Sequence, residues 1–193
     1  MQRTTGRLIA LAIIVSSFAA LPTANAAGIG VYGVAGLSGT ASTPPPTYGG
    51  KFNAGFGAFV RGDMIPGLDL EIGATLLKRT YNLNDLATFD YQTLELPIML
   101  RVTAIPILTV GGGIYGAFKL GSQTTDPAVA AVAPTVKGFD FGLVGALGVE
   151  FPFGPAGVFA ELRYLFGLTN MDDGGGSFQT RNMQGIAGVR IGI

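Results

Sequence analysis

The feature that most constrains this fold is an alternation of apolar and polar side chains that recurs along several separate stretches of the chain. The stretch 91–103 shows it most clearly, because every second residue is apolar: Leu94, Leu96, Ile98, Leu100 and Val102. The opposite parity carries Thr93, Glu95 and Arg101. A period of two places successive side chains on opposite faces of a β-strand, so the pattern predicts strands with one apolar and one polar face.

Eight such stretches can be read along the chain. They cover residues 28–38, 51–61, 68–80, 91–103, 107–120, 137–151, 157–168 and 182–193. Tight turns at 63–67, 104–106 and 152–155 alternate with longer polar segments at 39–50, 81–90, 121–136 and 171–181. An even strand count with short turns at one end and long loops at the other is typical of outer-membrane barrels. The predicted fold is therefore all-β, an eight-stranded antiparallel transmembrane up-and-down β-barrel.

The N-terminal segment has the three parts of a secretory signal peptide. Arg3 and Arg7 precede an apolar run over residues 8–20, and Ala24-Asn25-Ala26 forms a small-residue cleavage site. A retained membrane anchor is the alternative, but the apolar run is shorter than the roughly 20 residues that a spanning helix needs. We therefore expect a signal peptide over 1–26, cleavage after Ala26, a barrel domain over 27–193, and a location in the outer membrane of a Gram-negative cell envelope.

Composition narrows the classes of function. Charged residues make up 12% of the chain, about half the usual share of a soluble domain. The 12 basic and 12 acidic residues become 10 and 12 without residues 1–26, a balance of −2 that gives no footprint for nucleic acid. The sequence has no His and no Cys, the commonest general base and the thiol nucleophile. We therefore expect no enzymatic activity, no catalytic or cofactor-binding residues and no metal site.

The charged residues of the strands fall almost entirely on one face. This set comprises Asp69, Glu71, Glu95, Arg101, Lys119, Asp140, Glu150, Glu161, Arg163 and Arg190, and Lys51 and Arg61 could extend it. Periodicity alone leaves two arrangements, because a soluble lipocalin-like binding barrel would turn the apolar face inward. A charge that faces lipid costs about 2–4 kcal/mol near the midplane, whereas a charge in a narrow lumen can pair. We expect these residues to face inward and to close the lumen, since eight strands leave just enough room for side chains.

Two short motifs have an alternative chemical interpretation. Gly111-Gly112-Gly113 lacks the Lys-Ser/Thr and the helix of a phosphate-binding loop. These glycines are better explained as strand residues that permit tight curvature or make room for Tyr115 and the lumen charges. Glu161 and Arg163 place an acid and a base on one face, but no nucleophile accompanies them. An ion pair in the lumen is therefore favoured over a catalytic pair.

Several segments resemble the porin-family or PorT-like outer-membrane β-barrel proteins. They are LELPIML at 94–100, VGGGIYG at 110–116, FGLVGALGVE at 141–150, AELRY at 160–164 and GLTN at 167–170. The resemblance covers residues 51–193 and implies the barrel fold. It implies no catalytic residues, because the motifs are specific for the barrel and not for an activity.

These observations lead to an expected role and three alternatives. We expect a structural or surface-interaction barrel, monomeric, with outer-membrane lipid and the barrel-insertion machinery as partners and a surface ligand at the loops over 121–136 and 171–181. The alternatives are a narrow small-solute channel, a soluble periplasmic binding barrel and, least supported, a membrane-embedded enzyme.

Overall fold

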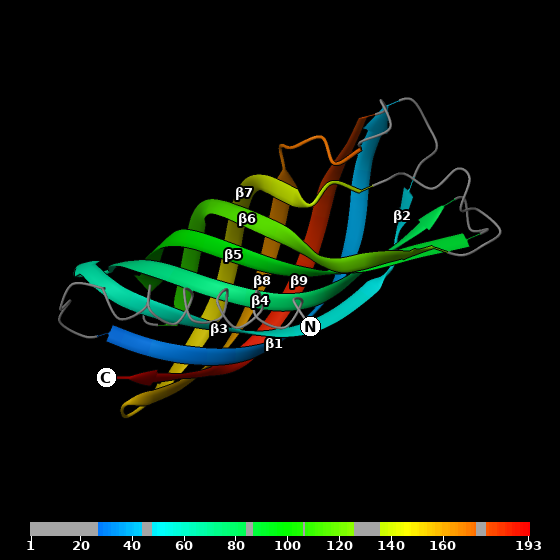
Figure 1. Cartoon of the computed structure of the whole chain (residues 1–193). Helices are drawn as coiled ribbons and strands as arrows, with labels where there is room; N and C mark the ends of the chain where they lie inside the picture. Colours follow the sequence, from blue (N-terminus) through cyan, green and yellow to red (C-terminus); the bar gives the residue numbers. More distant parts are fainter. Residues whose placement is uncertain (1–26, 44–47, 84–86, 106, 126–135, 173–176) are drawn as a thin grey trace, which may run out of the picture.

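The computed structural model describes residues 27–43, 48–83, 87–105, 107–125, 136–172 and 177–193. These residues form one elongated β-barrel, and the end of β9 lies beside the start of β1 (Figure 1). The predicted signal peptide over 1–26 and the predicted turn residue Pro106 lie outside the described residues.

Nine strands build the wall. They are β1 (Ala27–Thr43), β2 (Tyr48–Gly50), β3 (Phe52–Ile65), β4 (Leu68–Leu83), β5 (Ala87–Ile105), β6 (Leu108–Thr125), β7 (Phe139–Phe153), β8 (Ala156–Gly167) and β9 (Ser177–Gly192). Each pairs antiparallel with its neighbours in the order β2-β4-β3-β1-β9-β8-β7-β6-β5, and the β4–β5 pairing closes the ring. Both β2 and β3 pair with β4 and are separated only by Lys51, so together they fill one strand position of the wall. We call each strand position of the barrel wall a stave. The 9 − 1 = 8 staves confirm the predicted barrel.

Short turns join the strands at one end of the barrel, which we call the turn end. Gly67 and Gly154 adopt φ angles of 82° and 64°, a left-handed conformation that glycine adopts without steric cost. The chain therefore reverses within Pro66-Gly67 and Gly154-Pro155. The opposite end, which carries the longer connections, is called the loop end.

The strands continue well beyond the apolar stretches at the loop end, which corrects the predicted loop lengths. β1 runs to Thr43, β4 to Leu83 and β6 to Thr125, and β5 and β9 begin at Ala87 and Ser177. These extensions are paired, for example Tyr81 with Phe89 and Thr40 with Thr180. Backbone pairing does not require apolar side chains, so strands that project into water keep their ladder without the alternation that marks them in the sequence.

The wall has an apolar outer face and an inner face on which buried charges lie among buried apolar side chains. In β7, exposed and buried residues alternate from Phe139 to Gly148, and Leu143 and Leu147 leave 49% and 52% of their surfaces exposed on the outside. Arg101, Glu71 and Glu95 are buried inside. The soluble arrangement with an apolar interior is therefore wrong, because an apolar outer surface of this extent is stable in lipid and unfavourable in water. Among the residues that the structure describes, no helix is long and apolar enough to cross a membrane.

Close packing inside the barrel depends on glycines in the wall, and Gly57 is an example. The ring of Tyr32 lies against Gly57 of β3, where a Cβ would overlap the ring. This close approach lets the Tyr32 hydroxyl reach Thr75 Oγ1 on β4 at 2.7 Å. Small residues on the wall thus make room for large side chains in the lumen.

Candidate functional site

The interior of the barrel holds the only concentration of buried charge among the described residues. Because inward residues alternate along every strand, polar side chains from β3 to β9 converge in the lumen. They form two groups: a turn-side cluster of Arg61, Glu71, Arg101, Glu150, Glu161, Arg163 and Arg190, and a loop-side cluster of Arg79, Glu95 and Asp140.

Glu71 of β4 is the centre of the turn-side cluster. Its Oε2 accepts from Arg61 Nη2 at 2.9 Å, and its Oε1 accepts from Arg101 Nη2 at 2.9 Å and Arg163 Nη2 at 3.3 Å. The Glu71 side chain is 1% exposed, so all three contacts lie away from bulk water. A carboxylate shared by three guanidinium groups links β3, β4, β5 and β8 across the lumen.

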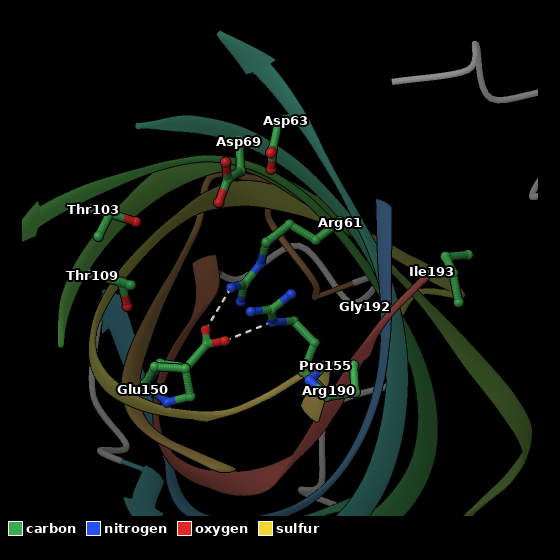
Figure 2. Close-up of a pocket in the computed structure, with 11 residues that line it drawn as sticks. Arg61, Asp63, Asp69, Thr103, Thr109, Glu150, Pro155, Arg190, Gly192 and Ile193 are labelled. Atoms are coloured by element: carbon green, nitrogen blue, oxygen red, sulfur yellow. Dashed lines mark hydrogen bonds and ion pairs between the residues drawn. The ribbon is translucent and has the colours of Figure 1, made fainter. Parts of the chain in front are cut away.

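Two further carboxylates complete this cluster. Glu150 of β7 accepts from Arg61 Nη1 at 2.7 Å and from Arg190 Nε at 2.6 Å, and Figure 2 shows it between the two guanidinium groups. Glu161 accepts from Arg163 Nε at 2.7 Å and lies 2.5 Å from Arg101 Nη1. Charge-assisted bonds of this kind are stronger than neutral ones, and each of these arginines except Arg190 has two carboxylate partners.

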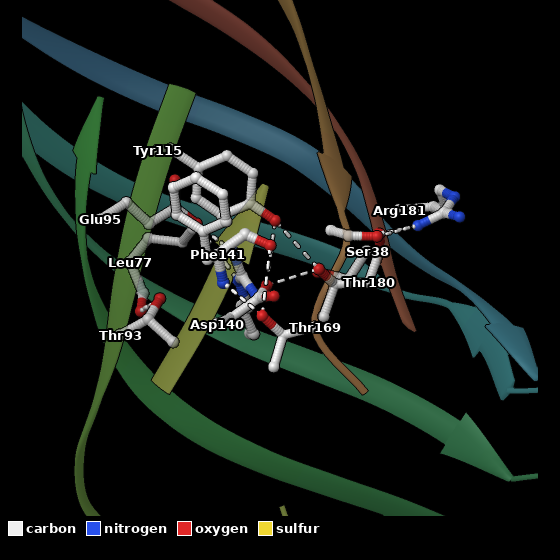
Figure 3. A network of polar contacts seen from close by, with 12 residues as sticks. Ser38, Leu77, Thr93, Glu95, Tyr115, Asp140, Phe141, Thr169, Thr180 and Arg181 are labelled. Atoms are coloured by element: carbon white, nitrogen blue, oxygen red, sulfur yellow. Dashed lines mark hydrogen bonds and ion pairs between the residues drawn. The ribbon is translucent and has the colours of Figure 1, made fainter. Parts of the chain in front are cut away.

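The loop-side cluster differs because it contains a single arginine, which contacts both of its carboxylates. Arg79 is fully buried and donates to Glu95 Oε1 at 2.8 Å, but its Nη1 lies 3.5 Å from Asp140 Oδ2. Hydroxyls supply the remaining donors to Asp140, with Tyr115 at 3.0 Å and Thr180 at 2.6 Å (Figure 3). Gln184 Nε2 donates to Glu95 Oε2 at 2.9 Å. This cluster therefore combines a single guanidinium group with three neutral donors.

The two clusters compensate each other in formal charge. The turn-side cluster has four arginines and three glutamates, 4 − 3 = +1, and the loop-side cluster has one arginine and two carboxylates, 1 − 2 = −1. The sum is zero, as expected for charges that are withdrawn from water.

Apolar side chains fill the space around the charges and cover the loop end. One buried group lies on β1, β3, β4, β8 and β9 and includes Tyr32, Phe59 and Phe159. At the loop end, an outer cap consists of Tyr81, Tyr91, Val136, Met171 and Phe178, each at most 2% exposed. Val136 and Met171 belong to the connections before β7 and before β9, and Lys119 Nζ donates to the Val136 carbonyl at 2.6 Å.

The turn end, by contrast, opens into a pocket of about 460 Å³. Its lining includes Asp63, Asp69, Thr103 and Thr109, together with Glu150 and its ion-pair partner Arg190 (Figure 2). No group of three or more His, Cys, Asp or Glu side chains in the described ranges is placed to hold a metal ion. The ion pairs of the turn-side cluster form the inner end of the pocket.

The predicted lumen residues occupy several environments. Eight of the ten take part in the ion pairs above, and the exceptions are Asp69, which faces Asp63 across β3 and β4 at the turn end, and Lys119, which contacts the outer cap. Arg61 joins the turn-side cluster. The extension to Lys51 is wrong, because this residue is exposed between β2 and β3.

Sequence reasoning missed Arg79, the most deeply buried charge of the lumen. The signal was present, because Arg79 shares the parity of Asp69 and Glu71 within the predicted strand 68–80. The adjacent Lys78 has the opposite parity and lies outside.

Comparisons with known proteins agree with this architecture. The family model described as "Outer membrane protein beta-barrel domain" matches residues 24–173. The crystal structure of the outer membrane protein OprG from Pseudomonas aeruginosa is similar, with a TM-score of 0.62 and 10% identity over 88% of this chain and 96% of that chain. Neisserial surface protein A is similar with a TM-score of 0.53 and 16% identity over 86% and 98% of the two chains. At these identities the likeness shows the fold alone. A search of curated proteins finds no match.

Proposed function

The chain belongs to the outer membrane protein β-barrel domain family, and from this premise we propose that it is a structural and surface-interaction protein of the bacterial outer membrane whose lumen is closed. The barrel anchors the chain in lipid, and the loop end is the part that meets surface partners. Short turns face the periplasm in such barrels, so the loop end is the extracellular one.

The observation that carries this proposal is the matched set of ion pairs across the lumen. Five arginines and five carboxylates are paired within the two clusters, and the outer cap lies beyond them on the extracellular side. A solute would have to separate pairs such as Arg101–Glu161 and Arg79–Glu95, which are at most 2% exposed. Breaking buried pairs is costly, so the closed state is favoured.

A narrow channel is the second candidate, and the pocket at the turn end favours it. This pocket gives solutes access from the periplasmic side as far as Glu150 and Arg190, and the Arg190 side chain is 28% exposed. In a channel, three barriers would have to open together: the Arg190–Glu150 ion pair, the other ion pairs of the turn-side cluster and the outer cap.

Bilayer recordings distinguish the two candidates. The folded wild-type protein should give no steady current in a planar bilayer, and Arg163→Ala and Glu161→Ala should also give none, because the outer cap and the loop-side cluster stay in place. An open porin serves as the positive control. Steady wild-type current, or current that appears in either variant, would replace the closed barrel by the channel.

Further parts of the proposal concern export, assembly and classification. We propose cleavage after Ala26, insertion by the barrel-insertion machinery, a monomeric state and membership of the PorT-like branch, supported by the motifs of residues 94–170. The absence of His and Cys supports a protein without catalytic activity. Intact-mass measurement of protein extracted from outer membranes tests the first point, because cleavage after Ala26 leaves 193 − 26 = 167 residues.

A further inference from the structure

The basic residues of the barrel are divided between the lumen and one rim. Residues 27–193 contain ten of them, of which five arginines form the lumen ion pairs and Lys119 contacts the outer cap. The remaining 10 − 6 = 4 are Lys51, Lys78, Lys137 and Arg181, and all four lie near the loop end. In the described part of the chain, the outer surface at the turn end therefore carries no basic side chain.

Three of these residues lie on neighbouring staves and form what we call the basic arc: Lys51, Lys78 and Arg181. Arg181 of β9 is paired with Gly39 of β1, and the Lys51 carbonyl accepts from the Ser38 amide on the other side of β1 at 3.2 Å. Lys78 follows on β4, which pairs with β3. Between Arg181 and Lys51 the outward residue of β1 is Gly39, and Leu37 follows it on the turn side, so only glycine separates the two charges at their own level.

The basic arc lies at the depth where the apolar belt ends. Phe52 and Phe56, next to Lys51 on the turn side, are 68% and 66% exposed. Arg181 lies 191 − 181 = 10 residues from the outward Ile191, and Lys78 lies 78 − 68 = 10 residues from Leu68. A tilted strand crosses the hydrocarbon in about 9–11 residues, so the arc is level with the lipid headgroups of the extracellular leaflet.

The positive charge of the basic arc is only partly neutralised. Arg181 stacks on the Phe166 ring at 3.6 Å and donates to the carbonyls of Gly167 and Thr180 and to the Gln179 amide oxygen, none of which is charged. Lys51 is exposed and has no carboxylate partner among the described residues. Lys78 pairs with Asp90, but its side chain is 58% exposed, and such a pair is weak.

We propose that the basic arc binds the phosphate-bearing headgroup of a lipid in the extracellular leaflet. Guanidinium and ammonium groups recognise phosphate through charge-assisted hydrogen bonds, and the stacking on Phe166 orients the Arg181 guanidinium at the interface. Gly39 of β1 leaves space for the headgroup between Arg181 and Lys51, while the exposed Phe52 and Phe56 contact acyl chains. The restriction of the charge to one rim matches a ligand that is present in one leaflet.

The test compares lipid A that carries its phosphates with the same lipid after removal of the phosphates. Each lipid is added to folded protein in neutral detergent, and the thermal unfolding midpoint is recorded. A ligand that binds only the folded state raises the midpoint as its concentration increases. We expect the phosphorylated lipid to stabilise the wild type more than the dephosphorylated lipid, with the difference declining in 1 M salt, where the Debye length is about 3 Å.

Variants assign this effect to the basic arc. The triple variant Lys51→Gln, Lys78→Gln, Arg181→Gln should lose the difference between the two lipids, while the matched control Lys137→Gln keeps it. Arg181→Lys retains the charge but loses the planar stack on Phe166, so it should keep most of the difference if the charge binds phosphate. Lys51→Gln alone changes only an exposed residue and should reduce the difference even if the triple variant folds poorly.

The inference would be overturned by a triple variant that responds as the wild type does, or by a wild-type response that is equal for the two lipids. The same response in Lys137→Gln as in the triple variant would show a general charge effect and would also overturn it. Heat-modifiable mobility on gels verifies that each variant is a folded barrel before the comparison is made.

Discussion

The two charge clusters of the lumen stabilise their buried carboxylates in different ways. In the turn-side cluster, Glu71 is saturated by three arginines, and the network connects four staves through charge-assisted bonds. In the loop-side cluster, Asp140 depends on the hydroxyls of Tyr115 and Thr180, and its contact with Arg79 is 3.5 Å long. Polar atoms without a partner in the described structure also concentrate near the loop-side cluster, in Asp140, Asn182 and Gln184.

This difference indicates that the turn-side cluster fixes the barrel and that the loop-side cluster is adaptable. A carboxylate that satisfies several buried cations cannot be removed without leaving them uncompensated. A carboxylate held by hydroxyls can be replaced by another acceptor at a lower cost, because the hydroxyl can rotate. Four substitutions sharpen the comparison.

Glu71→Gln should have the largest effect. The substitution preserves volume but leaves the arginines of the turn-side cluster with only two glutamates, so the free energy of unfolding should fall by about 3–5 kcal/mol. Urea unfolding in lipid vesicles, followed by circular dichroism because the chain has no Trp, measures it. A loss below about 1 kcal/mol would contradict the central role of Glu71.

Asp140→Asn should have a clearly smaller effect. Arg79 keeps its bond to Glu95, and the amide oxygen can still accept from Tyr115 and Thr180. The expected loss is about 1–3 kcal/mol, the range for an altered buried polar group. The same unfolding experiment applies, and a loss equal to that of Glu71→Gln would remove the distinction between the clusters.

Lys78→Gln provides the exposed reference. The Lys78–Asp90 pair is 2.6 Å long, but the lysine side chain is 58% exposed, so solvent screens the pair. We expect a loss below about 1 kcal/mol, as for other surface ion pairs. A larger value would mean that pairs outside the lumen contribute as much as those inside.

Asn182→Leu should have the smallest effect and can have the opposite sign. Both amide atoms of Asn182 lack a hydrogen-bond partner in the described structure, and the residue is 2% exposed. An apolar replacement of similar shape should leave the free energy of unfolding within about 0.5 kcal/mol or raise it. A loss above about 1 kcal/mol would show that the amide is satisfied by lumen water, which would make the loop-side cluster less adaptable than inferred.

The sequence by itself determined the wall of this barrel. Period-two alternation is a local property, so residues such as Leu143, Glu95 and Arg101 could be assigned to a face without knowledge of their neighbours. The pairing of short turns with longer connections set the strand order, and the cost of charge in lipid decided which face turns inward. The same parity would have placed Arg79 in the lumen.

Only the tertiary structure decided which inward side chains contact one another in the lumen. Arg61 meets Glu150, 89 residues away, because the stagger between strands and the closure of β4 on β5 set which inward residues share a level. The strand extensions and the inward position of Val136 and Met171 were equally hidden, since polar composition marks contact with water rather than the end of a ladder. Alternation is encoded residue by residue, whereas level and contact depend on the register of the whole ring.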